Sequence, residues 1–255
     1  MGKIVAFSNQ KGGVGKTTTA INMAAYVAHE GKKVLLIDFD PQGNAGSGFG
    51  VQKNKLTKTV YDLIMGNTSS SEVIYKTEID GLNIMPCNMD LAAAEIELVN
   101  VQRRESYLKD AIAPIKDNYD FIMIDCPPSL GLLTLNALTA SDCVIIPIQS
   151  EFFALEGLTQ LLNTIKLVKQ RMLNPTLTLS GVILTMNDTR SIMSRQVTDE
   201  IRNYFGKKVY ETAVPRNIKL CESPSFGIPI ILHAPRCAGA TAYLKLAREF
   251  IQKEG

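Results

Sequence analysis

Residues 9–18 read NQKGGVGKTT, a glycine-rich stretch that contains two lysines. The common phosphate-binding loop has the pattern G-x-x-x-x-G-K-[ST], which residues 15–17 complete. The first glycine of that pattern should stand at position 10, but the chain has Gln10 there, followed by a second lysine, Lys11. The stretch follows a short apolar run and precedes a helical pattern, as a phosphate-binding loop requires. We therefore predict a phosphate-binding loop with an additional cation.

The residue types of this loop suit a triphosphate. Its glycines let backbone N–H groups converge on phosphate oxygens without an intervening Cβ, and the following helix adds its positive N-terminal dipole. We expect Lys16 to reach the β- and γ-phosphates, Thr17 to offer its hydroxyl to Mg²⁺, and Thr18 to bind the α-phosphate. The alternative is a glycine-rich turn with a surface lysine. The loop residues predicted to bind ATP are Lys11, Gly12, Gly13, Val14, Gly15, Lys16, Thr17 and Thr18.

Three aspartates follow apolar runs that are expected to be strands. FIMID ends in Asp125, and LLIDFDPQGN contains Asp38 and Asp40. Ligands of open α/β sheets bind at the carboxyl ends of the strands. A single strand-end aspartate more often caps a turn, but three of them beside a phosphate-binding loop favour metal and water chemistry. We predict that Thr17, Asp38 and Asp125 hold the metal and that Asp40 orients the attacking water.

Short apolar runs alternate with helical patterns along the whole chain. Runs such as VLLID and FIMID are apolar on both faces, which is typical of central parallel strands covered by helices. This alternation predicts one α/β domain over residues 1–255, with a doubly wound, mostly parallel sheet and helices on both faces. The strands are expected at 3–9, 32–40, 119–128, 142–149, 177–187 and 208–215. The helices are expected at 16–31, 61–66, 90–112, 130–141, 153–172, 193–206 and 239–253.

Composition excludes some classes of protein. Apolar residues make up 45% of the 255 residues, enough for a substantial core. No apolar run approaches the roughly 20 residues that a membrane span needs. The five cysteines form no CxxC pair, which suits reduced thiols in a cytosolic protein. Residues 1–159 carry a net charge of −5 and residues 160–255 a net of +7, so the C-terminal part is either an ordinary solvated surface or a basic face for a polyanion.

Three stretches together resemble the deviant Walker A ATPases of the ParA/MinD class, which have the P-loop NTPase fold. They are KGGVGKTT at 11–18, DFDPQGN at 38–44 and DCPPSLG at 125–131. The similarity covers essentially the whole chain, including TMND at 185–188 and VPRNIKLCESPSFGIPI at 214–230. It points most closely to the small Soj/ParA partition ATPases. The resemblance implies an ATPase that is weak alone and stimulated by a partner, with ATP and Mg²⁺ as cofactors.

The resemblance also implies a role for the second lysine. In that class Lys11 would contact the phosphates of ATP held by the other subunit, so that ATP holds a sandwich homodimer together. A cation from each side offsets the negative charge of the triphosphate. The catalytic residues implied are Lys11, Lys16 and Asp40, while Asn187 would recognise adenine and Pro215 would cover the base. The alternative is that Lys11 only screens phosphate in its own subunit.

Two basic residues match family positions that contact DNA. They are Arg190 and Lys219, and Arg216 is expected to join them. The family commonly has arginine where Lys219 stands; lysine keeps the charge but loses the bidentate fork. Contacts to phosphate alone give binding without sequence preference. The alternative is that these cations are solvated or paired within the chain.

The partners implied are double-stranded DNA, bound without sequence preference, and a DNA-bound protein of the ParB type that stimulates hydrolysis. The chain would act in chromosome or plasmid segregation, in the cytoplasm and on the nucleoid. A MinD-like spatial regulator of a division site or other protein cargo is the alternative, but it would bind membrane through a free amphipathic C-terminal helix. Here the apolar stripe of residues 244–251 runs into the last core helix, so no membrane binding is expected. An amide ligase on the same fold is a third possibility.

Overall fold

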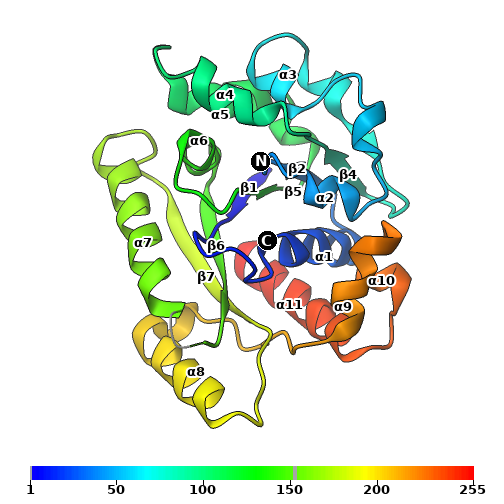
Figure 1. Cartoon of the computed structure of the whole chain (residues 1–255), viewed down its shortest axis with the longest axis vertical. Helices are drawn as coiled ribbons and strands as arrows, with labels where there is room; N and C mark the ends of the chain where they lie inside the picture. The colour runs from blue at the N-terminus through cyan, green and yellow to red at the C-terminus, as the bar shows by residue number, and fades with distance from the viewer. Residues whose placement is uncertain (1, 152–153) are drawn as a thin grey trace.

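A mostly parallel sheet forms the centre of the computed structural model, which describes residues 2–151 and 154–255 (Figure 1). Its seven strands lie in the order β3-β4-β2-β5-β1-β6-β7, and only the β3–β4 pair is antiparallel. The predicted mostly parallel sheet is confirmed. The strands are β1 Lys3–Phe7, β2 Val34–Asp38, β3 Tyr75–Lys76, β4 Leu82–Met85, β5 Phe121–Asp125, β6 Cys143–Gln149 and β7 Thr178–Thr185.

Helices cover both faces of the sheet, because each face carries its own layer of buried apolar side chains. One layer joins the strands to α1 and α11, through residues such as Val27 and Phe250. The other joins them to α6 and α7, through Leu133 and Leu161 (Figure 1). The α-helices are α1 Lys16–His29, α2 Asn44–Ser47, α3 Val60–Ile64, α4 Leu91–Glu97, α5 Tyr107–Ile112, α6 Leu132–Ala140, α7 Ala154–Gln170, α8 Ile192–Phe205, α9 Ile218–Glu222, α10 Ile230–His233 and α11 Ala238–Glu254.

The strand expected at 208–215 was wrong. Within it the chain makes only isolated bridges, of Val209 to β7 and of Pro215 to Asn187. Between them, the backbone N–H groups of Glu211 and Thr212 donate to the Glu249 carboxylate of α11, at 2.9 and 3.3 Å. A helix side chain thus takes two of the hydrogen bonds that a continuous sheet ladder would need.

The helix expected at 90–112 is broken into α4 and α5. Arg103 has a φ of +56°, a left-handed conformation that does not continue an α-helix. The Asn136 side chain accepts from Leu108 N–H and donates to Arg104 C=O, which fixes the second piece against α6. The pattern also missed β3 and β4, which supply one edge of the sheet.

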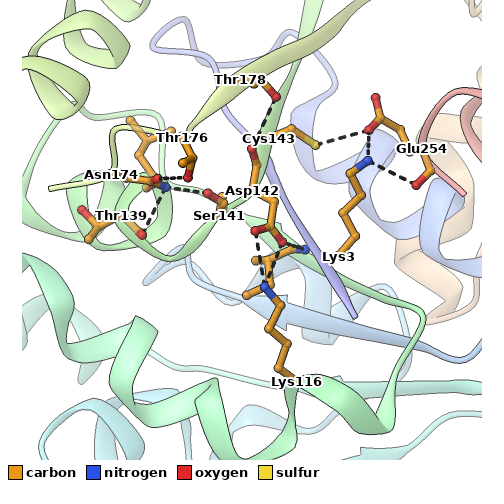
Figure 2. Close-up of polar contacts among 12 residues, drawn as sticks. Lys3, Lys116, Thr139, Ser141, Asp142, Cys143, Asn174, Thr176, Thr178 and Glu254 are labelled. Carbon is orange, nitrogen blue, oxygen red and sulfur yellow. Dashed lines mark hydrogen bonds and ion pairs between the residues drawn. The ribbon is translucent and has the colours of Figure 1, made fainter. Parts of the chain in front are cut away.

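The C-terminal helix is attached to the sheet at both its face and its end. Its buried side chains include Leu246 and Phe250. Figure 2 shows that Lys3, at the start of β1, contacts Glu254, with Nζ 2.6 Å from Oε2. Ser180 of β7 donates to the same carboxylate at 2.5 Å. The stripe of α11 therefore belongs to the core, as the sequence predicted. In the described part of the chain, no helix has the length and hydropathy to cross a membrane.

Candidate functional site

The phosphate-binding loop connects β1 to α1 at the carboxyl end of the sheet. Gly13 and Gly15 have φ values of +76° and +79°, a conformation that favours glycine. Val14, between them, is buried, and its carbonyl accepts a 2.7 Å hydrogen bond from the Thr185 hydroxyl at the end of β7. Around Gly12 and Gly13 there is open space. The loop is therefore held in place by β7 through Val14, while the side at Gly12 and Gly13 stays accessible.

Lys16 is the buried cation of the site. Its Nζ lies 3.2 Å from Asp125 Oδ1 and 3.9 Å from Asp40 Oδ2, and the side chain is 7% exposed. Burial lowers the pKa of Lys16, but Asp125 and Asp40 are among the groups that raise it, and its pKa ends above the ordinary value. Lys16 is therefore protonated before ATP arrives, and the structure brings together three of the predicted residues.

Asp38 and Asp125 lie side by side, because they are register partners at the ends of the parallel strands β2 and β5. Both side chains are completely buried. Burial, with a further contribution from the neighbouring Asp125, raises the pKa of Asp38 to about 7, although a 2.7 Å hydrogen bond from Gly46 N–H opposes the rise. Burial also raises the pKa of Asp125, although Lys16 and Thr17 oppose this. Two carboxylates crowded in this way favour a bound cation.

The residues present fit a magnesium ion. Asp38 Oδ1 and Asp125 Oδ2 are buried and have no hydrogen-bond partner among the described residues. Carboxylate and hydroxyl oxygens are hard ligands of the kind that Mg²⁺ takes in nucleotide sites, where phosphates and waters supply the rest. In the same described residues, no group of three or more His, Cys, Asp and Glu side chains forms a complete cage. The predicted set of Thr17, Asp38 and Asp125 is thus a partial set suited to a metal shared with phosphate.

Asp40 begins a loop that is held mainly through its backbone. Its carbonyl accepts from Gly43 N–H at 2.7 Å and from the Cys87 thiol at 2.8 Å, while its Oδ1 accepts from Gln42 N–H at 3.0 Å. Its Oδ2 faces Lys16. Cys87 was not predicted as part of the site, since it follows β4, a strand that the sequence pattern did not reveal.

Lys11 lies apart from this buried cluster. Its Nζ is 3.2 Å from Glu151 Oε2, and both side chains are partly exposed, at 36% and 49%. The other oxygen of Glu151 lies 3.9 Å from Arg216 Nη2. Glu151 was not predicted as part of the site. Its position just beyond the end of β6 is the sequence feature that could have indicated it. The two lysines of the loop therefore occupy opposite environments, one buried and one at the surface.

A cavity of about 180 Å³ adjoins the loop at Gly15. Its lining includes Thr18 and Pro215, as expected for a pocket that covers a base beside the phosphates. Met186 and Tyr243, which were not predicted, also line it. Asn187 does not; its amide donates to Ser150 and Thr198 hydroxyls, at 3.3 and 3.1 Å. Its backbone nevertheless bridges to Pro215.

The three predicted DNA contacts are exposed cations with carboxylate partners. Arg190 is 90% exposed and makes a two-pronged pair with Asp188, at 3.0 and 3.2 Å. Lys219 Nζ lies 2.9 Å from Glu222 Oε2. Pairing within the chain, the alternative considered from the sequence, is thus present. Because exposed ion pairs contribute only about 0–1 kcal/mol, a nucleic-acid phosphate can replace these carboxylates at small cost.

Known proteins resemble this chain both in sequence and in structure. A family model described as an AAA domain matches residues 2–179. The chain is similar to sporulation initiation inhibitor protein Soj of Bacillus subtilis, 55% identical over 249 residues and 98% of each chain. It is 52% identical over 254 residues to chromosome partitioning protein ParA of Myxococcus xanthus, covering 100% of this chain and 89% of that one. A structure of cobyrinic acid a,c-diamide synthase from Mycobacterium smegmatis, with bound ATP analog and magnesium, is 36% identical with a TM-score of 0.87, over 99% of this chain and 95% of its own.

Proposed function

Because this chain belongs to the AAA-domain family that includes the Soj and ParA partition proteins, we propose that it is a partition ATPase. It binds ATP and Mg²⁺, forms a sandwich homodimer, and then binds DNA without sequence preference. A DNA-bound protein of the ParB type stimulates hydrolysis and so releases it. The observation that carries the proposal is that the two lysines of one loop lie in different environments. Lys16 is buried beside two aspartates, while Lys11 is at the surface.

The buried cluster accounts for binding and hydrolysis of ATP. Lys16 and the backbone N–H groups of the loop neutralise the β- and γ-phosphates. Thr17, Asp38 and Asp125 hold Mg²⁺, which when bound neutralises charge that develops on the phosphate oxygens. Asp40 holds the attacking water in line with the γ-phosphate, and the hydrogen bonds to its carbonyl keep the carboxylate in place. The cavity beside Thr18 and Pro215 takes the base.

Lys11 supplies the link between subunits. It is exposed, and its only described ion pair is with the half-exposed Glu151, so little free energy holds it in its own subunit. Facing a second copy across the open outer side of the loop, Lys11 reaches the phosphates of the partner's ATP. Loss of the γ-phosphate on hydrolysis weakens this attraction. Hydrolysis therefore separates the subunits.

Dimerisation in turn controls DNA binding. One subunit offers a small patch of cations, Arg190, Arg216 and Lys219. Joining two patches makes the second contact intramolecular, and avidity then exceeds either affinity by about 10²–10⁴. Such binding depends on phosphate charge alone, so the protein spreads over the nucleoid in the cytoplasm without reading sequence.

A salt titration tests the proposed function. Binding to a duplex of random sequence is measured with a non-hydrolysable ATP analogue and Mg²⁺, with ADP, and without nucleotide. We expect tight binding only with the analogue, weakening steeply as salt rises because counterions are released. A duplex of unrelated sequence serves as the control and should bind equally. Absence of binding at low salt would remove DNA from the proposal.

Two other functions are distinguished by direct assays. A MinD-like regulator would sediment with anionic vesicles in the presence of ATP, which we do not expect because the apolar face of α11 is buried. An amide synthase is suggested by the name of the Mycobacterium smegmatis structure, but the identity there is 36%, against 55% to Soj. ATP turnover that requires cobyrinic acid and an ammonia donor would support it over partition.

A further inference from the structure

The loop that follows Asp40 meets the segment that carries Lys219 at two glycines. Gly50 and Gly227 have φ values of +74° and +67°. A Cβ built on Gly227 would lie 2.8 Å from Gly50 Cα and 3.1 Å from Gly50 N. A Cβ on Gly50 would lie 3.3 Å from the Gly227 carbonyl oxygen. Backbone therefore packs directly on backbone here, and a methyl group on Gly227 forces the two segments apart.

On one side, this contact is tied to the metal-site carboxylate. Asp38 Oδ2 accepts from Gly46 N–H at 2.7 Å, inside α2. The Gly46 carbonyl accepts from Val51 N–H at 3.1 Å, and Gly50 N–H donates to the Ser47 carbonyl at 3.0 Å. These short-range hydrogen bonds make residues 43–51 a compact unit that is bonded to Asp38 at Gly46 and contains Gly50. Gly43 N–H, which donates to the Asp40 carbonyl at 2.7 Å, joins Asp40 to the same unit.

On the other side, the contact is tied to the basic segment. Gly227 ends a 3-10 helix, Ser223–Phe226, that continues directly from α9 with Lys219. Gly227 N–H donates to the Pro224 carbonyl at 3.1 Å, and Pro224 lines the cavity beside the phosphate-binding loop. Residues 218–227 thus line the cavity proposed to take the base, carry Lys219, which is proposed to bind DNA, and contact Gly50 through Gly227.

Helix α1 supports both segments from beneath. A Cβ on Gly48 would lie 2.4 Å from Ile21 Cδ1, so that loop rests tightly on α1. Just beyond Gly227, Ile230 N–H donates to the Asn22 side chain at 2.9 Å. Since α1 begins at Lys16, neither segment can withdraw without disturbing the helix that follows the phosphate-binding loop. The glycine contact is the direct junction between them.

We propose that the Gly50–Gly227 contact transmits the state of the hydrolytic loop to the DNA-binding segment, and the reverse. This inference rests on the proposed function and specifies how DNA binding and hydrolysis influence each other within one subunit. When DNA draws Lys219 away from Glu222, the shift of α9 passes through Gly227 to Gly50 and changes the placement of Asp38 and Asp40. It is separate from the effect of dimerisation, which also links ATP to DNA.

The test uses the full chain at concentrations where the ATP dimer is complete, so that dimerisation contributes nothing further. Single-turnover ATP hydrolysis is measured with and without a random-sequence duplex. The variants are Gly227→Ala and Gly227→Asn; asparagine tolerates the left-handed backbone but still carries a Cβ. The matched control is Gly66→Ala, which has a φ of +76° and open space around its Cβ, so it carries the backbone strain without the clash.

For the unaltered chain and Gly66→Ala, we expect DNA to change the hydrolysis rate by about fivefold or more. Both Gly227 variants should bind ATP analogue and DNA but show a change below about twofold. A full DNA effect in the Gly227 variants would overturn the inference, as would the absence of any effect in the unaltered chain while it binds DNA. Should Gly227→Ala fail to fold, Gly227→Asn decides alone. Failure of the unaltered chain to bind DNA would instead count against the proposed function.

Discussion

The ammonium group of Lys11 lies 3.2 Å from Glu151 Oε2, in an ion pair at the surface of its own subunit. The pair joins the phosphate-binding loop to the end of β6. Both side chains stay partly exposed. In the proposed dimer, Lys11 exchanges Glu151 for a phosphate of the partner's ATP, and the ease of that exchange would decide how readily the dimer forms.

Replacing Glu151 with glutamine should change little in the free protein. Since an exposed pair contributes about 0–1 kcal/mol, we expect the free energy of unfolding to change by no more than about 1 kcal/mol. The ATP-dependent dimer should become tighter by up to about fivefold, because Lys11 no longer leaves a carboxylate. Denaturant titration and sedimentation provide the two measurements. A dimer weakened by about tenfold or more, contrary to this expectation, would show that Glu151 is needed at the seam.

Removing the Asp40 carboxylate should separate binding from hydrolysis. Asp40→Ala keeps Lys16 paired with Asp125, so we expect ATP affinity and dimer formation to persist. Hydrolysis should fall by about 10²-fold or more, because a group that positions or deprotonates the attacking water contributes at least that factor. Single-turnover assays measure the rate, and equilibrium binding of ATP analogue is the control. A rate that stays near that of the unaltered chain would remove Asp40 from the hydrolytic step.

Stability should depend on pH through Asp38. Its pKa is raised from 3.8 to about 7 in the folded protein, so the folded state holds this proton more tightly than the unfolded state. Without nucleotide and Mg²⁺, unfolding free energy should therefore fall as pH rises from about 4 to about 7. Asp38→Asn should remove that part of the fall and be more stable above pH 7, on the order of 2–4 kcal/mol.

The matched control for this pH series is Asp117→Asn, on an exposed residue. It should follow the unaltered chain at every pH. Equal pH profiles for Asp38→Asn and the unaltered chain would contradict the raised pKa of the buried Asp38 carboxyl. Added Mg²⁺ with ATP analogue should restore stability to the unaltered chain at high pH. Below about pH 7, where Asp38 still holds its proton, binding of the metal should release that proton, because metal ligands must be deprotonated.

Phosphate contacts should appear in the salt dependence of DNA binding. Arg190→Ala and Lys219→Ala should each weaken binding to every duplex about equally and reduce the salt slope by about 1 for each phosphate that the side chain had neutralised. Lys76→Ala, on the exposed part of edge strand β3, is the control and should leave the slope unchanged. A slope unaffected by Arg190→Ala would assign that side chain to its pair with Asp188 alone.

The parts of the site that could be predicted from sequence are those set by short-range pattern. The loop glycines, Lys16 and the three aspartates follow runs that are apolar on both faces, so their place at the carboxyl ends of central strands was foreseeable. Register then brings Asp38 beside Asp125. The doubly wound fold was predictable for the same reason.

The parts that were missed depend on contacts between distant segments. Cys87 reaches Asp40 only because β4 joins the sheet beside β2, and the four residues of β4 give too short a pattern to identify. Residues 208–215 have the composition of a strand, but Glu249 takes the hydrogen bonds of Glu211 and Thr212 in the middle of the segment. The pairing of Lys11 with Glu151 spans 140 residues and leaves no periodic signal.

The proposed binding of each ATP by residues of both subunits is tested most directly by sedimentation equilibrium, which measures the mass of the protein with a non-hydrolysable ATP analogue and Mg²⁺. The unaltered chain should sediment with twice the mass of one chain, and Lys11→Ala should bind the analogue equally well yet sediment as a monomer. A monomer of the unaltered chain under saturating analogue, or an intact dimer of Lys11→Ala, would contradict the role of Lys11 across the seam.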